Sequence, residues 1–263
     1  MNIHFDDKDL FDKLKRATIA KVLVGSHMYG TNNEKSDKDF LYIYATSENE
    51  LTSAIVSNHQ LQYKEDGVDH NFVSLHSFIR NTINGDSTIN FEVIQSDSLI
   101  DTNLEWLSSY KDSFITYTVI RSYLGLAKRD LKHLSKASDE LKKKRLGHII
   151  RGFLYSLDMI NKKFNFRLIN NELIFIMKDL FFSKEVVSEY EAKINLLRNE
   201  LNDKLNNKTL GLSQHMNVED AINITKSLNY FCKSGVFKNC QEELKDFDMS
   251  YFMNAFENWV DYN

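Results

Sequence analysis

The sequence contains no proline and only two cysteines among its 263 residues. Without proline, helices run uninterrupted, and glycine and asparagine are the main breaks in the pattern. The two cysteines, Cys232 and Cys240, lie near the end of the sequence, with no second Cys or His pair at metal-binding spacing. Neither a zinc module nor a disulfide framework is indicated, and we interpret both residues as free thiols in a reducing compartment.

Long hydrophobic runs are missing as well. No window approaches the roughly 18 consecutive apolar residues of a membrane span, and the first residues lack the apolar stretch of a secretory signal. The formal net charge of -4 argues against a uniformly basic nucleic-acid binder but permits a local basic groove. We therefore expect a cytoplasmic protein with no membrane partner.

Hydrophobic residues make up 42% of the chain, enough for a buried core, and their spacing changes along it. A helix is expected at 8–20, strands at 21–24, 40–45, 61–63 and 68–73, and another helix at 75–83. The Asp66-Gly67 pair between the last two strands predicts a hairpin. Further helices are expected at 118–134, 141–164, 186–205, 218–232 and 242–260. The pattern predicts a small α/β unit, residues 1–100, followed by a helical domain, residues 101–263.

Two short motifs lie at the ends of the first predicted strands. Gly25-Ser26 ends one strand, where backbone N–H groups can bind phosphate, glycine allows close approach and serine adds a hydroxyl donor. Asp37 and Asp39, two residues apart at the head of the next strand, project to the same side and can bind hard cations. Each motif alone is more often an ordinary turn, but their joint occurrence favours a phosphate site with a divalent metal.

These residues resemble the signature of the DNA polymerase β-type nucleotidyltransferase superfamily. The Gly-Ser-x-x-Tyr-Gly run at 25–30 and the Ser-Asp-x-Asp run at 36–39 are similar to its YcgL-like branch of bacterial and phage predicted nucleotidyltransferases. Further similarities follow in the order Asp69, Ser74-Leu75-His76-Ser77-Phe78, Gly85 and Glu92, then more weakly at 123–128 and 148–151. The resemblance therefore covers the predicted α/β unit and, weakly, the start of the helical domain.

The resemblance implies an α+β protein in which a small mixed-sheet nucleotidyltransferase domain precedes an α-helical domain that binds nucleotide or acceptor. It implies that Asp37 and Asp39 hold two Mg²⁺ ions, with Mn²⁺ as the alternative metal. It also implies that Gly25 and Ser26 bind the triphosphate of a nucleoside triphosphate, expected to be ATP.

A third carboxylate is implied to complete this site. It would help hold the second metal and accept the proton of the attacking hydroxyl. Asp69 is our candidate for this position, and Asp66 is its rival. The metals would stabilise the attacking and leaving oxygens while pyrophosphate departs.

Residues 128–151 form the one distinctly basic region of this acidic chain, with nine Lys or Arg against three acidic residues. Such a region can bind the phosphates of a nucleotide or of an RNA acceptor, or it can be a solvated face of two helices. Tyr123, Lys128 and Arg151 are the candidates for nucleotide binding, whereas residues 142–145 are assigned to solvent. Arg151 lies on an otherwise apolar helix face, where a charge usually has a partner.

Two other features are interpreted as structural. Glu92 is flanked by apolar residues, and pairing with a cation is favoured over a place in the site. The aromatic residues within 175–182 and 251–259 have helical spacing, and we assign them to the helical core rather than to a base-stacking platform.

The leading hypothesis is a Mg²⁺-dependent nucleotidyltransferase that moves a nucleoside monophosphate from a triphosphate to an acceptor hydroxyl and releases pyrophosphate. The basic region favours RNA or tRNA as the acceptor. One alternative is a nucleotidyltransferase fold that modifies or neutralises a partner protein, as in a toxin and antitoxin pair or a defence system. Another is an inactive relative that binds nucleotide without turnover, against which the presence of both Asp37 and Asp39 speaks.

Overall fold

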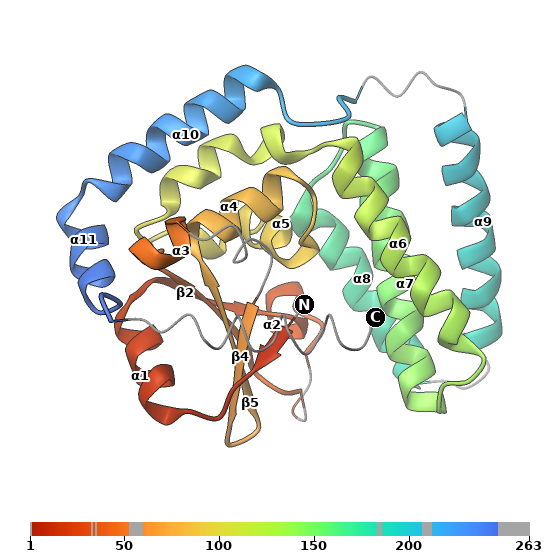
Figure 1. Ribbon diagram of the computed structural model, residues 1–263. Helices are drawn as coiled ribbons and strands as arrows, with labels where there is room; N and C mark the ends of the chain where they lie inside the picture. The colour runs from red at the N-terminus through yellow and green to blue at the C-terminus, as the bar shows by residue number, and fades with distance from the viewer. Residues whose placement is uncertain are drawn as a thin grey trace, which may run out of the picture.

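A computed structural model describes residues 2–32, 34, 36–52, 60–182, 186–206 and 212–246. Its core is one five-stranded mixed sheet, surrounded and followed by helices (Figure 1). This arrangement confirms the predicted α+β class. Within the described residues, no helix is long and apolar enough to cross a membrane.

The sheet has the strand order β1-β4-β5-β3-β2. Its strands are β1 Asn2–His4, β2 Thr18–Val24, β3 Asp39–Tyr44, β4 Gln60–Glu65 and β5 Val68–Ser74. The β2/β3 and β4/β5 pairs are antiparallel, whereas the β3/β5 and β1/β4 pairs are parallel. Asp66 and Gly67 join β4 to β5, both with positive φ, which is the two-residue turn expected of an Asp-Gly hairpin.

Short helices alternate with the strands, and longer ones follow them. The first group is α1 Lys8–Arg16, α2 Ser26–Tyr29, α3 Glu48–Thr52, α4 Leu75–Ile83 and α5 Thr88–Gln95, with the 3-10 helices η1 Asp97–Leu99 and η2 Glu105–Phe114. The second group is α6 Tyr117–Leu134, α7 Asp139–Ile160, α8 Phe166–Phe182, α9 Val186–Asn206, α10 Val218–Cys232 and α11 Gly235–Glu242.

Two predicted helices are corrected. The helix expected at 8–20 ends at Arg16, because residues from Thr18 onward join the sheet as β2, where their β-branched side chains fit better. The helix expected at 242–260 falls mostly outside the described residues, and a helix that we did not predict, α11, ends where it was expected to begin. Phe175 is 70% exposed, contrary to the assignment to the core, and the other aromatic side chains of 175–182 and 251–259 lie outside the described part.

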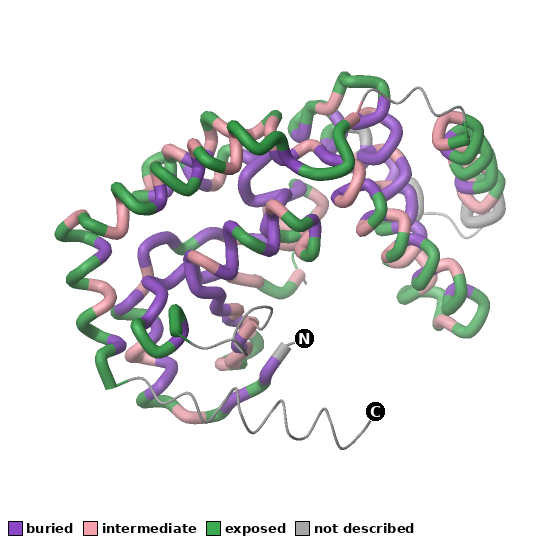
Figure 2. The backbone as a smooth tube through the Cα atoms, turned by 45° about the horizontal axis from the view of Figure 1, so that its top comes forward, coloured by how far each residue is buried: buried purple, intermediate pink, exposed green. Residues whose placement is uncertain are grey.

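Both faces of the sheet are covered. Alternate residues of β3 point to opposite sides, so Leu41 and Ile43 join the large core under α4 and α5. Tyr42 and Tyr44 face the smaller core, which α1 covers with Phe11 and Leu14 among other residues. In Figure 2 the buried stretches gather where helices meet the sheet or each other.

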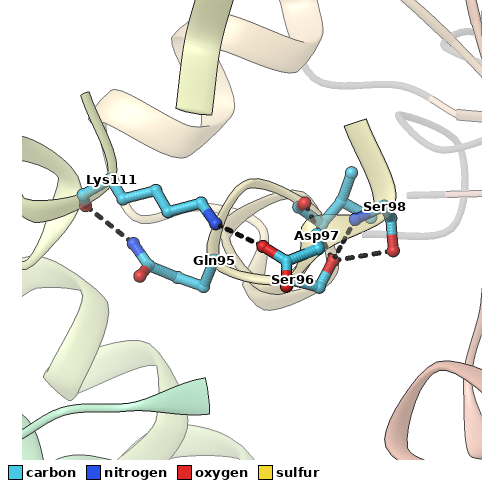
Figure 3. Close-up of polar contacts among 6 residues, drawn as sticks. Gln95, Ser96, Asp97, Ser98 and Lys111 are labelled. Atoms are coloured by element: carbon cyan, nitrogen blue, oxygen red, sulfur yellow. Dashed lines mark hydrogen bonds and ion pairs between the residues drawn. The ribbon is translucent and has the colours of Figure 1, made fainter. Parts of the chain in front are cut away.

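The connection near residue 100 is fixed by polar contacts (Figure 3). The side-chain amide of Gln95 donates to the carbonyl of Lys111 at 2.7 Å, and the ammonium of Lys111 lies 3.1 Å from a carboxylate oxygen of Asp97. The hydroxyl of Ser96 accepts from the backbone N–H of Ser98 and thereby caps η1. The chain thus passes from α5 into η2 through an ordered segment.

The last described helix, α11, packs against β2 of the sheet (Figure 1). The Gln241 amide donates to the carbonyl of Thr46 at 2.9 Å, and Arg16 forms an ion pair with Glu243 at 2.8 Å. Residues 235–246 therefore contact the unit that begins the chain, while the division at residue 100 stays a prediction.

Candidate active site

The register of the sheet brings the main candidate residues together. Val24 pairs with Asp39 across the antiparallel β2/β3 ladder, and Asp39 pairs with Asp69 across the parallel β3/β5 ladder. Residues in register on adjacent strands point to the same face. The side chains of Asp39 and Asp69 consequently lie next to each other, at the edge where β2 ends and β3 and β5 begin.

Gly25 follows β2 directly and touches this pair. Its φ is 66°, in the left-handed region that favours glycine, and a Cβ there would lie 2.8 Å from Oδ2 of Asp39. Ser26 then begins the four-residue helix α2, which ends at Tyr29. The predicted phosphate motif and the predicted metal motif are therefore in contact through Gly25 and Asp39.

The electrostatic setting of Asp39 favours a cation. Burial raises the pKa of its carboxyl, and the negative charges of Asp69 and Asp37 raise this pKa further. The positive charges of Lys144 and His27 lower it, but burial and the neighbouring acids prevail. An added cation at this position would relieve the repulsion between the carboxylates.

Several polar atoms around the pair are buried without a hydrogen bond from any described residue. They are Oδ1 of Asp69, Nε2 of His27 and, further away, Nε of Arg151. The nearest cation to Asp69 is Lys64, whose Nζ lies 3.4 Å from Oδ1. Asp66, the rival third carboxylate, is exposed on the hairpin turn and is not in register with Asp39.

The donor set fits a hard divalent cation in part. Two adjacent carboxylates supply the oxygen ligands that Mg²⁺ and Mn²⁺ accept, and one of them, Asp69, is also in ion-pair contact with Lys64. Asp37 is exposed and precedes β3 rather than belonging to it. Across the described ranges, no three His, Cys, Asp or Glu side chains are grouped closely enough to hold a metal. The pair of Asp39 and Asp69 is therefore the part of the predicted site that the fold assembles.

A buried polar cluster lies behind α2. Glu92 on α5 is fully buried and accepts hydrogen bonds from the hydroxyls of Tyr29, at 2.5 Å, and Tyr123, at 2.9 Å. Nε of Arg151 is 3.8 Å from Oε1 of Glu92, and its guanidinium carbon lies 4.0 Å from the centre of the Tyr29 ring. The expectations that Glu92 pairs with a cation and that Arg151 has a partner are both confirmed, and the two residues are each other's partners.

Burial keeps both phenols of this cluster protonated. It raises the pKa of Tyr29 and of Tyr123 well above the ordinary value, and the negative charge of Glu92 raises both further. Each hydroxyl thus stays a donor to Glu92 at neutral pH. The cluster links α2, which follows the phosphate motif, to α6 and α7.

The three candidates of the helical region lie in different places. Tyr123 is buried and its hydroxyl is used by Glu92, whereas Arg151 keeps 19% of its side chain exposed. Lys128 is exposed on α6 and forms no ion pair with the described carboxylates. Direct contact of these residues with a nucleotide stays a prediction.

The basic run 142–145 is not simply solvated. Nζ of Lys142 lies 2.7 Å from Oε1 of Glu191 on α9. The guanidinium of Arg145 donates to the carbonyl of His133 at 2.5 Å. The assignment of this run to solvent was wrong for both residues, because α7 packs between α6 and α9 and each neighbour supplies an acceptor.

Sequence reasoning missed Lys144. Its charge acts on Asp39, and it lies with His148 and Arg151 on one face of α7, at a spacing of four and three residues. Nδ1 of His148 is 3.7 Å from Oδ2 of Asp130, and Nε of Arg129 is 3.4 Å from the other oxygen, Oδ1, of the same carboxylate. Burial and the charges of Arg151 and Lys144 lower the pKa of His148 to about 4. Lys144 and Arg151 are spaced so that they share one face of a helix, and this spacing could have identified Lys144 from the sequence.

No protein-family model matches the sequence, and no curated protein matches it either. Among solved structures, the chain is similar to a nucleotidyltransferase-like protein from Exiguobacterium sibiricum 255-15, at 11% sequence identity. The match covers 94% of this chain and 89% of that one, with a TM-score of 0.28. A likeness of this degree assigns no function, so the function has to be argued from the residues themselves.

Proposed function

We propose that the protein is a Mg²⁺-dependent nucleotidyltransferase that moves a nucleoside monophosphate from ATP or another triphosphate to an acceptor hydroxyl. The observation that carries this proposal is the contact of Gly25 with Asp39, together with the register of Asp39 and Asp69. A strand end proposed to bind phosphate and a pair of carboxylates proposed to bind cations thus meet at one point.

Asp39 and Asp69 would hold the metal, joined by Asp37 from the segment before β3. Bound divalent cations would supply charge neutralisation for the attacking and leaving oxygens. Gly25 and Ser26 are the groups proposed to bind the triphosphate, through backbone N–H groups and the serine hydroxyl.

The proposed reaction transfers one group. The acceptor oxygen bonds to the α-phosphorus, the bond from that phosphorus to the bridging oxygen breaks, and pyrophosphate leaves with the electron pair. The hydroxyl proton passes to a carboxylate, and that of Asp69, in register with Asp39, is our candidate for it.

RNA is the acceptor that we propose. Lys128, Lys132 and Lys136 are exposed on and just after α6, and none of them pairs with a carboxylate of the described residues. Exposed cations of this kind bind phosphate backbones without needing a specific sequence. Lys142 and Arg145 pair with protein groups, whereas these three lysines of the basic region stay exposed to solvent.

The test incubates the purified protein with Mg²⁺, each α-labelled triphosphate in turn, and a mixture of total RNA and cell protein. We expect label on RNA with the wild type and none with the Asp37→Ala, Asp39→Ala double variant. Label on a protein band would replace RNA by protein as the acceptor. Transfer that the double variant retains, or no transfer and no pyrophosphate release with any triphosphate, would contradict the proposal.

A matched pair of substitutions identifies the third carboxylate. Asp69→Asn removes the carboxylate beside Asp39, whereas Asp66→Asn makes the same change on the exposed turn, where asparagine tolerates the left-handed backbone. We expect transfer to be lost in the first variant and kept in the second. The reverse result would assign the role to Asp66.

A further inference from the structure

One face of α7 gathers positive charge. Lys144, His148 and Arg151 follow one another at four and three residues and therefore share a face of the helix. Arg129 of α6 lies beside them, since it contributes to the field at His148. The acidic group nearest to His148 is Asp130, whose carboxylate Arg129 also contacts. Cations thus outnumber acids around His148.

The neighbouring cations of α7 are directed elsewhere. Lys142 pairs with Glu191 of α9, and Arg145 donates to the carbonyl of His133 at the end of α6. These contacts join helices to each other. Lys144, by contrast, is exposed and has no carboxylate of the described residues within ion-pair distance. Lys143 has no ion pair with the described carboxylates either, but Lys144 is the more exposed of the two and shares the helix face of His148 and Arg151.

This face of α7 is directed at the candidate active site. At its far end, the Arg151 guanidinium lies 4.0 Å from the ring of Tyr29, which ends α2. At the other end of α2, Gly25 contacts the carboxylate of Asp39. Lys144 is also near enough to the same carboxylate for its charge to act on it. The cationic face and the carboxylate pair are therefore connected through the short helix α2.

Each member of the face has a means of holding an anion. Lys144 and Arg151 are cations, and Glu92 holds Arg151 in place from the side of the core. His148 has a pKa of about 4, so it is neutral at pH 7 and donates one N–H without adding charge. Successive donors along a helix can each bind one phosphate of a polyphosphate chain. A polyphosphate is therefore the anion we expect here, beside the proposed divalent-metal site.

We propose that Lys144, His148 and Arg151 form an anion subsite on α7 that binds the β- and γ-phosphates of the nucleoside triphosphate. This inference rests on the proposed function, because it places the leaving pyrophosphate opposite the carboxylates. It assigns a role in nucleotide binding to Lys144 and His148.

The test measures equilibrium binding of ATP and of AMP in the presence of Mg²⁺. Lys144→Ala is the test variant, and Lys143→Ala is the control, since it removes the same charge from the next position on the helix. We expect Lys144→Ala to weaken ATP binding about tenfold, as for loss of one charge-assisted contact, and AMP binding by less than about twofold. Lys143→Ala should leave both affinities unchanged.

The outcomes separate this inference from the proposed function. If the wild type binds ATP and Lys144→Ala binds it equally well, the subsite is wrong while the nucleotidyltransferase proposal stands. Equal loss of ATP and AMP affinity would also overturn the subsite, because the effect would then not depend on the terminal phosphates. If the wild type binds none of the four common triphosphates, both proposals fail. Unfolding curves of the two variants confirm that each is folded.

Discussion

Oδ2 of Asp39 lies 2.8 Å from the point that a Cβ atom would occupy at Gly25. The backbone of Gly25 also has a φ of 66°, which side chains rarely tolerate. Two separate constraints therefore require glycine at this position. One of them comes from the carboxylate that we expect to bind metal, so the phosphate motif and the metal motif hold each other in place.

Gly25→Ala should destabilise the protein more than Gly67→Ala does. Gly67 also has a positive φ, of 77°, but a Cβ there meets nothing within 4 Å. Gly67→Ala therefore reports a backbone cost alone, about 1–2 kcal/mol. At Gly25 a ψ of -145° raises the backbone cost, and the contact with Asp39 adds to it. Urea unfolding of both variants measures the difference, and transfer activity should be lost only in Gly25→Ala. Equal unfolding free energies would show that neither the backbone conformation of Gly25 nor the carboxylate of Asp39 resists a side chain there.

The local parts of this site could be predicted from the sequence. Asp66-Gly67 encodes a two-residue hairpin through backbone preference alone, and the hairpin fixes the register of β4 with β5. Gly25-Ser26 and Asp39 are each recognisable because their chemistry depends on a few neighbouring residues. The expectation of a partner for Glu92 also follows from the cost of burying an unpaired charge.

The non-local parts could not be predicted. The parallel pairing that places Asp69 beside Asp39 depends on the order of strands, which the sequence pattern does not specify. The directions of Lys142, Lys144 and Arg145 depend on how α7 is rotated against α6 and α9. That rotation is set by packing over many residues, so a run of four cations gave no indication of which one faces the site.

Tyr123→Phe should cost more stability than Tyr155→Phe. Both hydroxyls are buried, but Tyr123 donates to the carboxylate of Glu92 whereas Tyr155 donates to the neutral amide oxygen of Asn170. A hydrogen bond to a charged group contributes roughly 1.5–3 kcal/mol and one to a neutral group about 1 kcal/mol. Denaturant unfolding at pH 7 measures both. A smaller loss for Tyr123→Phe would show that the hydrogen bond to Glu92 contributes less to stability than the one to Asn170.

Protein stability should fall as the pH is lowered from 7 towards 4, in part because of His148. Its pKa is about 4 in the folded protein and about 6.5 when unfolded, so the unfolded chain binds the extra proton first. The loss begins near the unfolded pKa and levels off below the folded one. The His148→Gln variant should show a flatter dependence over this window in urea unfolding at a series of pH values. An identical slope in the variant would place the pKa of His148 near its ordinary value.

Asp39→Asn should stabilise the metal-free protein while abolishing transfer. Burial and the charges of Asp69 and Asp37 raise the pKa of Asp39, which means that the ionised carboxylate disfavours the fold at pH 7. An uncharged amide of the same shape removes this repulsion, whereas Mg²⁺ would relieve it in the wild type by binding. Thermal unfolding should therefore give the variant the higher midpoint without Mg²⁺, and added Mg²⁺ should raise the midpoint of the wild type but not of the variant. A Mg²⁺-induced shift of equal size in both proteins would mean that the ion binds elsewhere, and Asp39 would then lose its place as a metal ligand.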